Sequence, residues 1–238
     1  MRQFSSLIRV EDLEPGDHVA CLYQTDEERQ ALVETLLHCG LERREKILYI
    51  ADGNAPMAVQ EWFRKDRAVV QRCMQTGQLS ILTDEETFME RGVFDPSRMI
   101  TLLVGHAKRA LRAGYSGLRV MGEMGWASRG FPGSHHLIDY EAKLNESLPE
   151  SKCLLFCQYD RRLWSSALLL YVLATHPIVA AGANLCKNPY YMAHLPFLGH
   201  HHPKTILEWM LINLSKCRHT GEDFQSTVRN LSIFRRRA

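Results

Sequence analysis

The sequence predicts an α/β fold in which a mostly parallel sheet is flanked by helices on both faces. Two observations predict it. Short apolar runs rich in strand formers alternate with longer segments of helical periodicity, which is the pattern of consecutive β-α-β units. Several runs, such as residues 118–122 and 153–159, are apolar almost throughout, as in strands buried on both faces. The chain has 238 residues, 45% of them hydrophobic, which suits one large domain with a substantial core.

The first 52 residues predict a strand, a helix and a second strand. Residues 18–23 are a short apolar run after Gly16, and a polar segment follows them. Thr25 or Asp26 can cap the next helix, and we expect Gly40 to end it. Residues 46–51 then supply a strand, so we expect a β-α-β unit with a right-handed crossover.

The same alternation continues through the rest of the domain. Asp95 and Pro96 mark a helix start, because Asp caps helices and proline is favoured in the first turn. Pro177 stops the last of these helices, because proline cannot continue one. We expect helices over residues 55–76, 96–113, 134–148 and 165–175, and strands over 79–83, 118–122, 153–159 and within 178–185.

The character of the chain changes beyond Tyr191. We therefore divide it into a sensory-type domain over residues 1–191 and a linker with a C-terminal helix and basic tail over 192–238. The apolar residues of this helical appendage share one face, since they recur at helical spacing; they are Leu207, Met210, Leu211 and Leu214. That face could join a second chain as a dimerisation or signalling helix, or pack on the domain's own sheet.

Composition excludes several classes of protein. The formal net charge of +2 is too small for the field of a dedicated nucleic-acid binder, so we expect no direct DNA binding. No stretch reaches the roughly 20 apolar residues that cross a bilayer, and the first ten lack the core of a signal peptide. We therefore expect a cytoplasmic protein without membrane contact. The seven scattered cysteines are expected to be reduced and mostly buried.

The loop of residues 23–29 lies where a nucleotide-binding domain carries its phosphate cradle. It has no glycine and no Lys-Ser/Thr pair, and three consecutive acids at positions 26–28 would repel phosphate. The acids suit the N-terminus of the following helix instead. ATP hydrolysis by this loop is not expected.

Polar residues follow two of the buried strands. Glu123 and Trp126 come after residues 118–122, and Gln158 and Tyr159 lie at the end of residues 153–159. The carboxyl ends of strands are the usual ligand position in open α/β sheets, so these residues are candidates for a pocket. The alternatives are packing or a salt bridge for Glu123, and helix capping by Asp160.

The histidines and cysteines do not predict a metal site or a cofactor. His200, His201 and His202 are adjacent, which suits adventitious metal binding, but the chain has no His-x-x-x-His helical pair. Cys153 and Cys157 share one face of an expected strand, yet at strand rise they lie about 13 Å apart. They cannot hold one ion together.

A series of segments, taken in order, resembles the MEDS domain, the sensory domain of methanogen and methylotroph regulators and of the dichloromethane-dehalogenase repressor. The resemblance runs from about residue 15 to 192, and its segments are residues 18–23 with the acids that follow, 40–51, 119–126, 137–145, 157–160, 175–177 and 188–191. It implies a RecA-like sheet, similar to a P-loop NTPase but degenerate because the phosphate-binding loop is missing. It also implies a sensor of small molecules such as simple hydrocarbon derivatives.

MEDS domains are usually attached to a DNA-binding helix-turn-helix or to a histidine kinase, and neither is recognisable in this sequence. We expect a non-enzymatic sensory domain that binds a small organic ligand and signals to a transcriptional or kinase partner, with a homodimer left open. The residues expected to line its pocket are Tyr23, Gln24, Glu123, Trp126, Gln158, Tyr159 and His176. Two alternatives stand beside it: a RecA-like nucleotide-binding regulator, and a ligand-free adaptor that uses the C-terminal helix.

Overall fold

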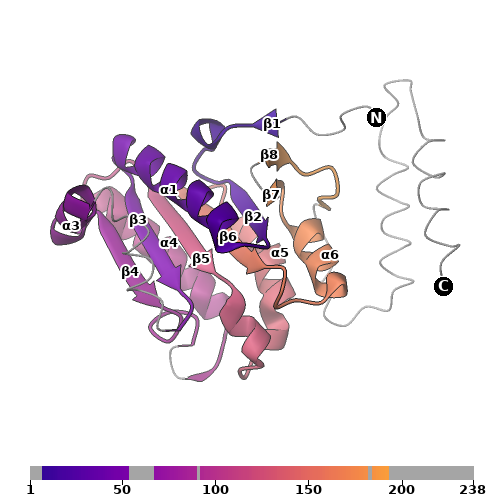
Figure 1. The fold of residues 1–238 in the computed structure, drawn as a ribbon. Coiled ribbons are helices and arrows are strands. Elements are labelled where there is room, and N and C mark those ends of the chain that lie inside the picture. The colour runs from indigo at the N-terminus through magenta and orange to yellow at the C-terminus, as the bar shows by residue number, and fades with distance from the viewer. Residues whose placement is uncertain (1–6, 54–66, 90–91, 182–183, 193–238) are drawn as a thin grey trace, which may run out of the picture. The chain divides into compact units, whose positions relative to one another are not determined.

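A computed structural model describes residues 7–53, 67–89, 92–181 and 184–192 of the chain. They form one eight-stranded sheet in the order β1-β8-β7-β2-β6-β5-β3-β4 (Figure 1). The strands from β7 to β4 in that order are parallel, whereas β8 runs antiparallel to both β7 and β1. The strands are β1 (Leu7–Ile8), β2 (His18–Tyr23), β3 (Lys46–Ala51), β4 (Leu79–Thr83), β5 (Leu118–Glu123), β6 (Cys153–Asp160), β7 (Ile178–Ala181) and β8 (Asn184–Lys187).

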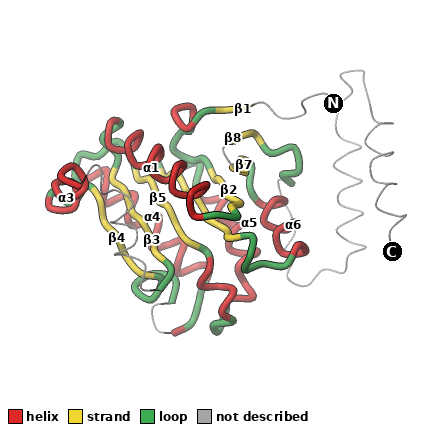
Figure 2. Tube along the Cα trace, viewed as in Figure 1, coloured by secondary structure: helices red, strands yellow, loops and turns green. Residues whose placement is uncertain are grey.

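Helices cover both faces of the sheet (Figures 1 and 2). The core on one face joins side chains of α1 and α3 to those of the strands. On the other face α5 packs against both α4 and α6. The helices are α1 (Asp26–Glu42), α3 (Arg67–Gln75), α4 (Pro96–Arg112), α5 (Leu137–Ser147) and α6 (Ser166–Thr175), with short 3-10 turns at Val10–Asp12, Gly125–Arg129 and Ser134–His136. The expected α/β fold with a mostly parallel sheet is confirmed.

The central strands are buried along their whole length. Every residue of β5 and of β6 is buried. Side chains of a strand alternate between the two faces of a sheet, so each strand sends one set toward α1 and the other toward α5. In β6, Leu154 and Phe156 join the core on the α1 face, and Cys157 lies against Glu141 of α5. Gln158 therefore belongs to the α1 face.

Helix α1 begins as expected but ends later. The Thr25 hydroxyl accepts a hydrogen bond from the backbone N–H of Glu28, so Thr25 is the N-cap. The expected stop at Gly40 is wrong, because the helix continues to Glu42. A Cβ at Gly40 would lie only 3.0 Å from Nε of Arg119, a fully buried side chain that donates to Glu45 at 2.6 Å. Glycine at this position allows the helix to pass close over β5 rather than ending it.

Other expected elements differ in detail. Instead of one strand within residues 178–185, the chain forms two strands, β7 and β8, which pair antiparallel to each other. The expected helix over 134–148 begins with a 3-10 turn and becomes α-helical at Leu137. In the expected β-α-β unit, β2 and β3 are parallel but β6 and β5 lie between them.

Two expected segments extend outside the described residues. The helix expected over residues 55–76 is described only from Arg67 to Gln75. The linker and helical appendage expected over residues 192–238 lie almost wholly outside the described part of the chain. Among the helices that the structure describes, none combines the length and the apolar character that crossing a membrane would require.

Candidate functional site

Two clusters of polar side chains are buried on opposite faces of the central strands. The strand-end cluster, on the α1 face, comprises Tyr23, Arg29, Tyr49, Glu123 and Gln158. The histidine cluster, on the α5 face, comprises His18, Glu141, Cys157, Tyr159 and His176.

The strand-end cluster forms where four neighbouring parallel strands end. The sheet order β2-β6-β5-β3 brings their carboxyl ends to one edge, and Glu123 of β5 pairs in register with Gln158 of β6. The Tyr49 hydroxyl of β3 donates to Glu123 Oε1 at 2.6 Å and lies 3.3 Å from Gln158 Oε1. The backbone N–H of Asp52 donates to Glu123 Oε2 at 3.1 Å.

A cation from α1 completes the strand-end cluster. Nη1 of Arg29 lies 3.1 Å from Glu123 Oε1, and its guanidinium carbon lies 4.8 Å from the centre of the Tyr23 ring. Burial opposes the charge of Arg29, but the carboxylate of Glu123 holds its pKa above the ordinary value. Burial also raises the pKa of the Tyr23 and Tyr49 phenols, so both stay protonated donors.

The amide of Gln158 has an unpartnered N–H. The side chain of Gln158 is 1% exposed, and its Nε2 makes no hydrogen bond with any described residue. A buried amide N–H without a partner is costly, and a bound oxygen acceptor would relieve that cost. The phenol, carboxylate and amide of Tyr49, Glu123 and Gln158 thus offer hydrogen-bond donors and acceptors close together.

Ion pairs surround the strand-end cluster. Arg129 lies 2.8 Å from Asp52 and also contacts Asp84. Burial and the neighbouring carboxylates of Asp84 and Glu123 raise the pKa of Asp52 to about 6, although Arg129 opposes the shift. On the other side Arg162 pairs with Asp160 at 2.5 Å, so Asp160 is bound by an arginine in addition to ending β6.

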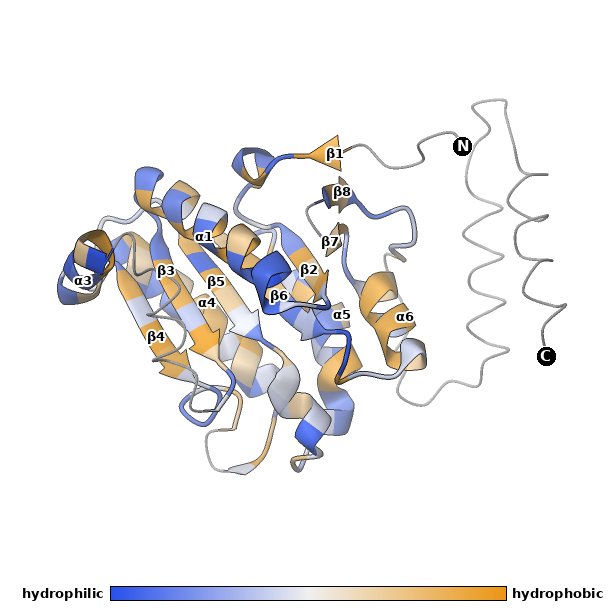
Figure 3. Ribbon diagram, viewed as in Figure 1, coloured by the Kyte–Doolittle hydropathy of each residue, from blue (hydrophilic) through white to orange (hydrophobic). Residues whose placement is uncertain are grey.

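The start of α1 uses its own residues to satisfy its first turn. Besides the Thr25 cap, the backbone N–H of Gln24 donates to Glu28 at 2.9 Å. The first turn of α1 carries Asp26, Glu27 and Glu28 and is blue in Figure 3. This arrangement agrees with the absence of a phosphate cradle in the sequence, because acids and internal caps occupy the place of converging N–H groups.

The histidine cluster is assembled from four elements and is inaccessible to solvent. His18 begins β2, Cys157 lies in β6, Glu141 in α5, and His176 directly follows α6. His18 Nε2 lies 3.0 Å from Glu141 Oε2, and His176 Nε2 lies 3.5 Å from the same oxygen. Cys157 Sγ is 3.6 Å from His18 Nε2 and 3.7 Å from Glu141 Oε2. All of these side chains are at most 1% exposed.

The surroundings of the histidine cluster orient each group. The Tyr159 hydroxyl donates to Glu141 Oε1, the oxygen that faces away from the histidines. Burial disfavours the Glu141 carboxylate, but His176 and His18 with this hydrogen bond hold its pKa below the ordinary value. Burial and His18 lower the pKa of His176 to about 3, so that imidazole is neutral. Burial and Glu141 raise the pKa of the Cys157 thiol.

The structure divides the seven residues expected to line one pocket. Tyr23, Glu123 and Gln158 lie together in the strand-end cluster. Tyr159 and His176 lie on the other face, in the histidine cluster. The remaining two, Gln24 and Trp126, lie elsewhere: Gln24 is in the exposed loop before α1, and Trp126 is fully buried against Phe88 and Phe94. Phe88 stacks on Trp126 with ring centres 4.9 Å apart.

Sequence reasoning missed five residues of the two clusters: Arg29, Tyr49, His18, Glu141 and Cys157. One signal was present for Glu141. It lies within the apolar stripe of α5, with Leu137 and Leu144 on the same face, and an acid in such a stripe marks a buried carboxylate. His18, Tyr49 and Cys157 give no comparable signal, because each belongs to an apolar run that is typical of a buried strand. Arg29 gives none because it lies in the polar start of a helix.

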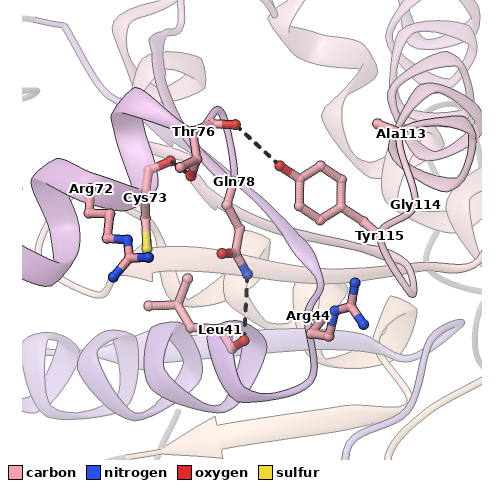
Figure 4. A pocket seen from close by; sticks show the side chains of 9 residues that line it. All are labelled: Leu41, Arg44, Arg72, Cys73, Thr76, Gln78, Ala113, Gly114 and Tyr115. Carbon is pink, nitrogen blue, oxygen red and sulfur yellow. Dashed lines mark hydrogen bonds between the residues drawn. The ribbon is translucent and has the colours of Figure 1, made fainter.

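A separate hollow lies at the opposite ends of the strands. Its cavity volume is about 450 Å³, and its lining includes residues just before β3, β4 and β5, namely Arg44, Gln78 and Tyr115 (Figure 4). The Tyr115 hydroxyl points toward Thr76 and lies 3.5 Å from its backbone oxygen. The hollow is therefore at the amino ends of the strands, away from both clusters.

The comparisons with known proteins agree with this architecture. The model of the MEthanogen/methylotroph, DcmR Sensory (MEDS) domain matches residues 17–177. A KaiC-like protein of the hyperthermophilic archaeon Pyrococcus horikoshii OT3 is similar in structure, with a TM-score of 0.50 and 11% identity over 69% of this chain and 71% of that one. The flagellar accessory protein FlaH of Methanocaldococcus jannaschii gives a TM-score of 0.47 and 11% identity over 75% and 80%. No curated protein matches the sequence.

Proposed function

Because the chain belongs to the MEDS family of sensory domains and has a RecA-like fold, we propose that it is a non-enzymatic sensor that binds a small organic molecule at the strand-end cluster. Binding would then be passed to a transcriptional or kinase partner. The observation that carries the proposal is the buried Gln158 amide with an unpartnered N–H, held among Tyr49, Glu123 and Arg29.

The position of the cluster supports ligand binding. In open α/β sheets, ligands bind outside the carboxyl ends of parallel strands, where the strand-end cluster lies. The phosphates of a nucleotide would meet Asp26, Glu27 and Glu28 at the start of α1 rather than a glycine-rich loop. A neutral ligand avoids that repulsion.

The chemistry of the cluster narrows the ligand class. Arg29 already neutralises Glu123, so a charged ligand would leave one charge unpaired. The amide N–H of Gln158 offers one donor, and the ring of Tyr23 offers apolar surface. These groups suit a small neutral molecule with one oxygen acceptor, such as an alcohol or a ketone. Such molecules are simple hydrocarbon derivatives.

Binding can produce a signal only if the ligand favours one conformation over another. Arg29 belongs to α1, whereas Gln158 and Glu123 belong to the sheet. A ligand between them would change how firmly α1 is held against the sheet, and α1 is therefore the element that would report occupancy.

The experiment is a calorimetric titration of the full chain with a panel of short alcohols, ketones and carboxylates, and with Mg-ATP. We expect a neutral member of the panel to bind, and Gln158→Leu to weaken that binding about fivefold, since a hydrogen bond is worth about 1 kcal/mol. Tyr115→Phe, in the hollow at the other edge, is the matched control and should bind as the wild type does.

Two results would overturn the proposal. If the wild type and Gln158→Leu bind the ligand equally well and Tyr115→Phe binds it more weakly, the ligand binds in the hollow at the amino ends of the strands instead. Tight binding of Mg-ATP with no organic ligand would instead favour the nucleotide-binding regulator.

A further inference from the structure

The geometry of the histidine cluster points to a second site, and we propose that it binds one divalent transition-metal ion, with Zn²⁺ the best fit. The ligand atoms are Nε2 of His18, Oε2 of Glu141, Sγ of Cys157 and Nε2 of His176, which all lie within 4.8 Å of one another. The site is on the other face of the sheet from the strand-end cluster, so the inference does not depend on the proposed function.

The distances between the ligand atoms approach the edges of a zinc tetrahedron. Zn–N and Zn–O bonds of about 2.0 Å and Zn–S bonds of about 2.3 Å, at tetrahedral angles, place ligand atoms roughly 3.3 to 3.6 Å apart. In the protein, Cys157 Sγ lies 3.6 Å from His18 Nε2 and 3.7 Å from Glu141 Oε2, and His176 Nε2 lies 3.5 Å from Glu141 Oε2. His18 Nε2 lies closer to Glu141 Oε2, at 3.0 Å, and no two ligand atoms are more than 4.8 Å apart, so side-chain shifts would be needed to complete the tetrahedron.

Both imidazoles present the correct nitrogen. The Asn145 amide donates its N–H to the carbonyl of Thr175 at 2.8 Å, so its oxygen faces His18 Nδ1, 3.1 Å away, and must accept from it. His176 Nδ1 lies 2.7 Å from the carbonyl of Val172 and donates to it. In each ring Nδ1 therefore carries a proton, and Nε2 is the nitrogen that faces the cluster and would bind the metal.

Such outer hydrogen bonds are the usual support of metal ligands. Metal-binding histidines donate their second N–H to a carbonyl or an amide oxygen, and metal-binding carboxylates are themselves hydrogen-bonded. Glu141 meets this condition as well, because Tyr159 donates to the oxygen that the metal would not use. Three of the four proposed ligands are thus held from behind.

A proton alone does not satisfy the cluster. One proton between His18 Nε2 and Glu141 Oε2 would form a single hydrogen bond at 3.0 Å. His176 Nε2 would still be fully buried and without a hydrogen-bond partner among the described residues. A metal ion binds both nitrogens, the sulfur and the oxygen together.

Charge and ligand type favour zinc. Binding would break the Cys157 S–H bond, form an S–Zn bond and release the proton to solvent. Zn²⁺ with one thiolate, one carboxylate and two neutral imidazoles has no net charge, which suits a site that water does not reach. Mixed imidazole, thiolate and carboxylate ligands suit a borderline ion, whereas Mg²⁺ and Ca²⁺ prefer oxygen alone.

The site would connect parts of the fold that lie far apart in the sequence. Its ligands come from β2, α5, β6 and the end of α6, so one ion would tie two helices to the sheet (Figure 1). All four protein ligands fill the tetrahedron, which is the arrangement of structural rather than catalytic zinc sites. The expectation from sequence of no metal site rested on ligands adjacent in the chain, and these ligands are not adjacent.

The first experiment measures zinc in the full chain, purified without a metal resin, by elemental analysis. We expect one zinc per chain. Cys157→Ser should lower the affinity for Zn²⁺ about 100-fold or more, and Asn145→Ala, which removes an outer partner, about 10- to 100-fold. Cys153→Ser is the matched control, because Cys153 is buried in the same strand and on the same face but outside the cluster. A variant with His200, His201 and His202 changed to Ala controls for surface binding.

A second measurement does not depend on any variant folding. The chelator-treated wild type is titrated with Co²⁺, and a thiolate-to-cobalt charge-transfer band that saturates at one equivalent supports the site. A wild type that binds neither Zn²⁺ nor Co²⁺ at micromolar concentration would overturn the proposal. So would a zinc content that Cys157→Ser leaves unchanged and the triple histidine variant abolishes.

Discussion

The strand-end cluster and the histidine cluster lie on the same central strands, but the buried carboxylate of each is compensated by different partners. On the α1 face the carboxylate of Glu123 faces the guanidinium of Arg29, so the charges are paired within the protein. On the α5 face the described contacts of Glu141 are two imidazoles, a thiol and a phenol. In the first cluster the amide N–H of Gln158 has no acceptor among the described residues, whereas in the second cluster two imidazoles, a thiol and a carboxylate converge.

This difference indicates which kind of ligand each cluster can bind. A buried polar group without a partner is costly, so the missing partner indicates the ligand. An unpartnered N–H at Gln158 suits a neutral oxygen, and converging lone pairs at His18 and His176 suit a cation. One face of the sheet would then be a sensing face and the other a stabilised one.

Removal of zinc is expected to have the largest effect, and it should act on the histidine cluster but not on the strand-end cluster. Zinc that binds only the folded chain stabilises it by about 4 kcal/mol at 1,000 times the Kd. We expect chelation to lower the free energy of unfolding by at least that amount, measured by urea denaturation, and Cys157→Ser to lose this dependence. Cys153→Ser should keep it. If a chelator leaves the free energy of unfolding unchanged, the histidine cluster is stable without a metal ion, and the proposed difference between the two clusters is wrong.

The next effect breaks the ion pair of the strand-end cluster. Arg29→Met leaves the Glu123 carboxylate buried with only the Tyr49 and Asp52 hydrogen bonds, and we expect a loss of about 3 kcal/mol in the free energy of unfolding at neutral pH. The double variant Arg29→Met with Glu123→Leu removes both charges and should recover most of the loss. A single variant as stable as the wild type would show that Glu123 does not need its cation.

The sequence predicted the sheet but only part of either cluster. Residues 118–122 and 153–159 read as buried strands, and the ends of parallel strands meet at one edge, so Glu123 and Gln158 could be placed together. Tyr49 could not be added, because its contact depends on β5 and not β2 lying beside β3. That order comes from long crossovers that periodicity does not record.

The histidine cluster was harder to predict from the sequence than the strand-end cluster. Its ligands at positions 18, 141, 157 and 176 meet only because β2 and β6 pair in a fixed register and α5 packs against α6. The sequence places Tyr159 at the ligand pocket because it ends an expected buried strand, and His176 behind it. The alternation of side chains sends Tyr159 to the face opposite its neighbour Gln158.

One substitution made in both clusters sharpens the comparison. Tyr49→Phe and Tyr159→Phe each remove a hydroxyl that donates to a buried carboxylate, a bond worth about 1.5–3 kcal/mol. Glu123 keeps Arg29, so Tyr49→Phe should cost about 1.5 kcal/mol. Tyr159→Phe should cost more, about 2 kcal/mol, in chelator-treated protein, and it should also weaken Zn²⁺ binding. Equal costs and unchanged zinc affinity would show that Tyr159 does not support the metal ligand.

The smallest effect is a pH dependence confined to the rim of the strand-end cluster. Burial raises the pKa of Asp52 to about 6, above its ordinary value of 3.8, so the folded protein binds this proton more tightly than the unfolded chain does. The stability that the protonated form contributes is complete below pH 4 and is lost as the pH rises through 6.

Asp52→Asn does not ionise, so its free energy of unfolding relative to the wild type should increase by about 1 kcal/mol between pH 4 and pH 7. Urea denaturation at several pH values measures this difference, with Asp139→Asn, a partly buried acid of α5 outside the strand-end cluster, as the control. A constant difference between wild type and Asp52→Asn across that range would mean that Arg129 compensates the charge fully, and both rim and centre of the strand-end cluster would then be neutralised by arginine.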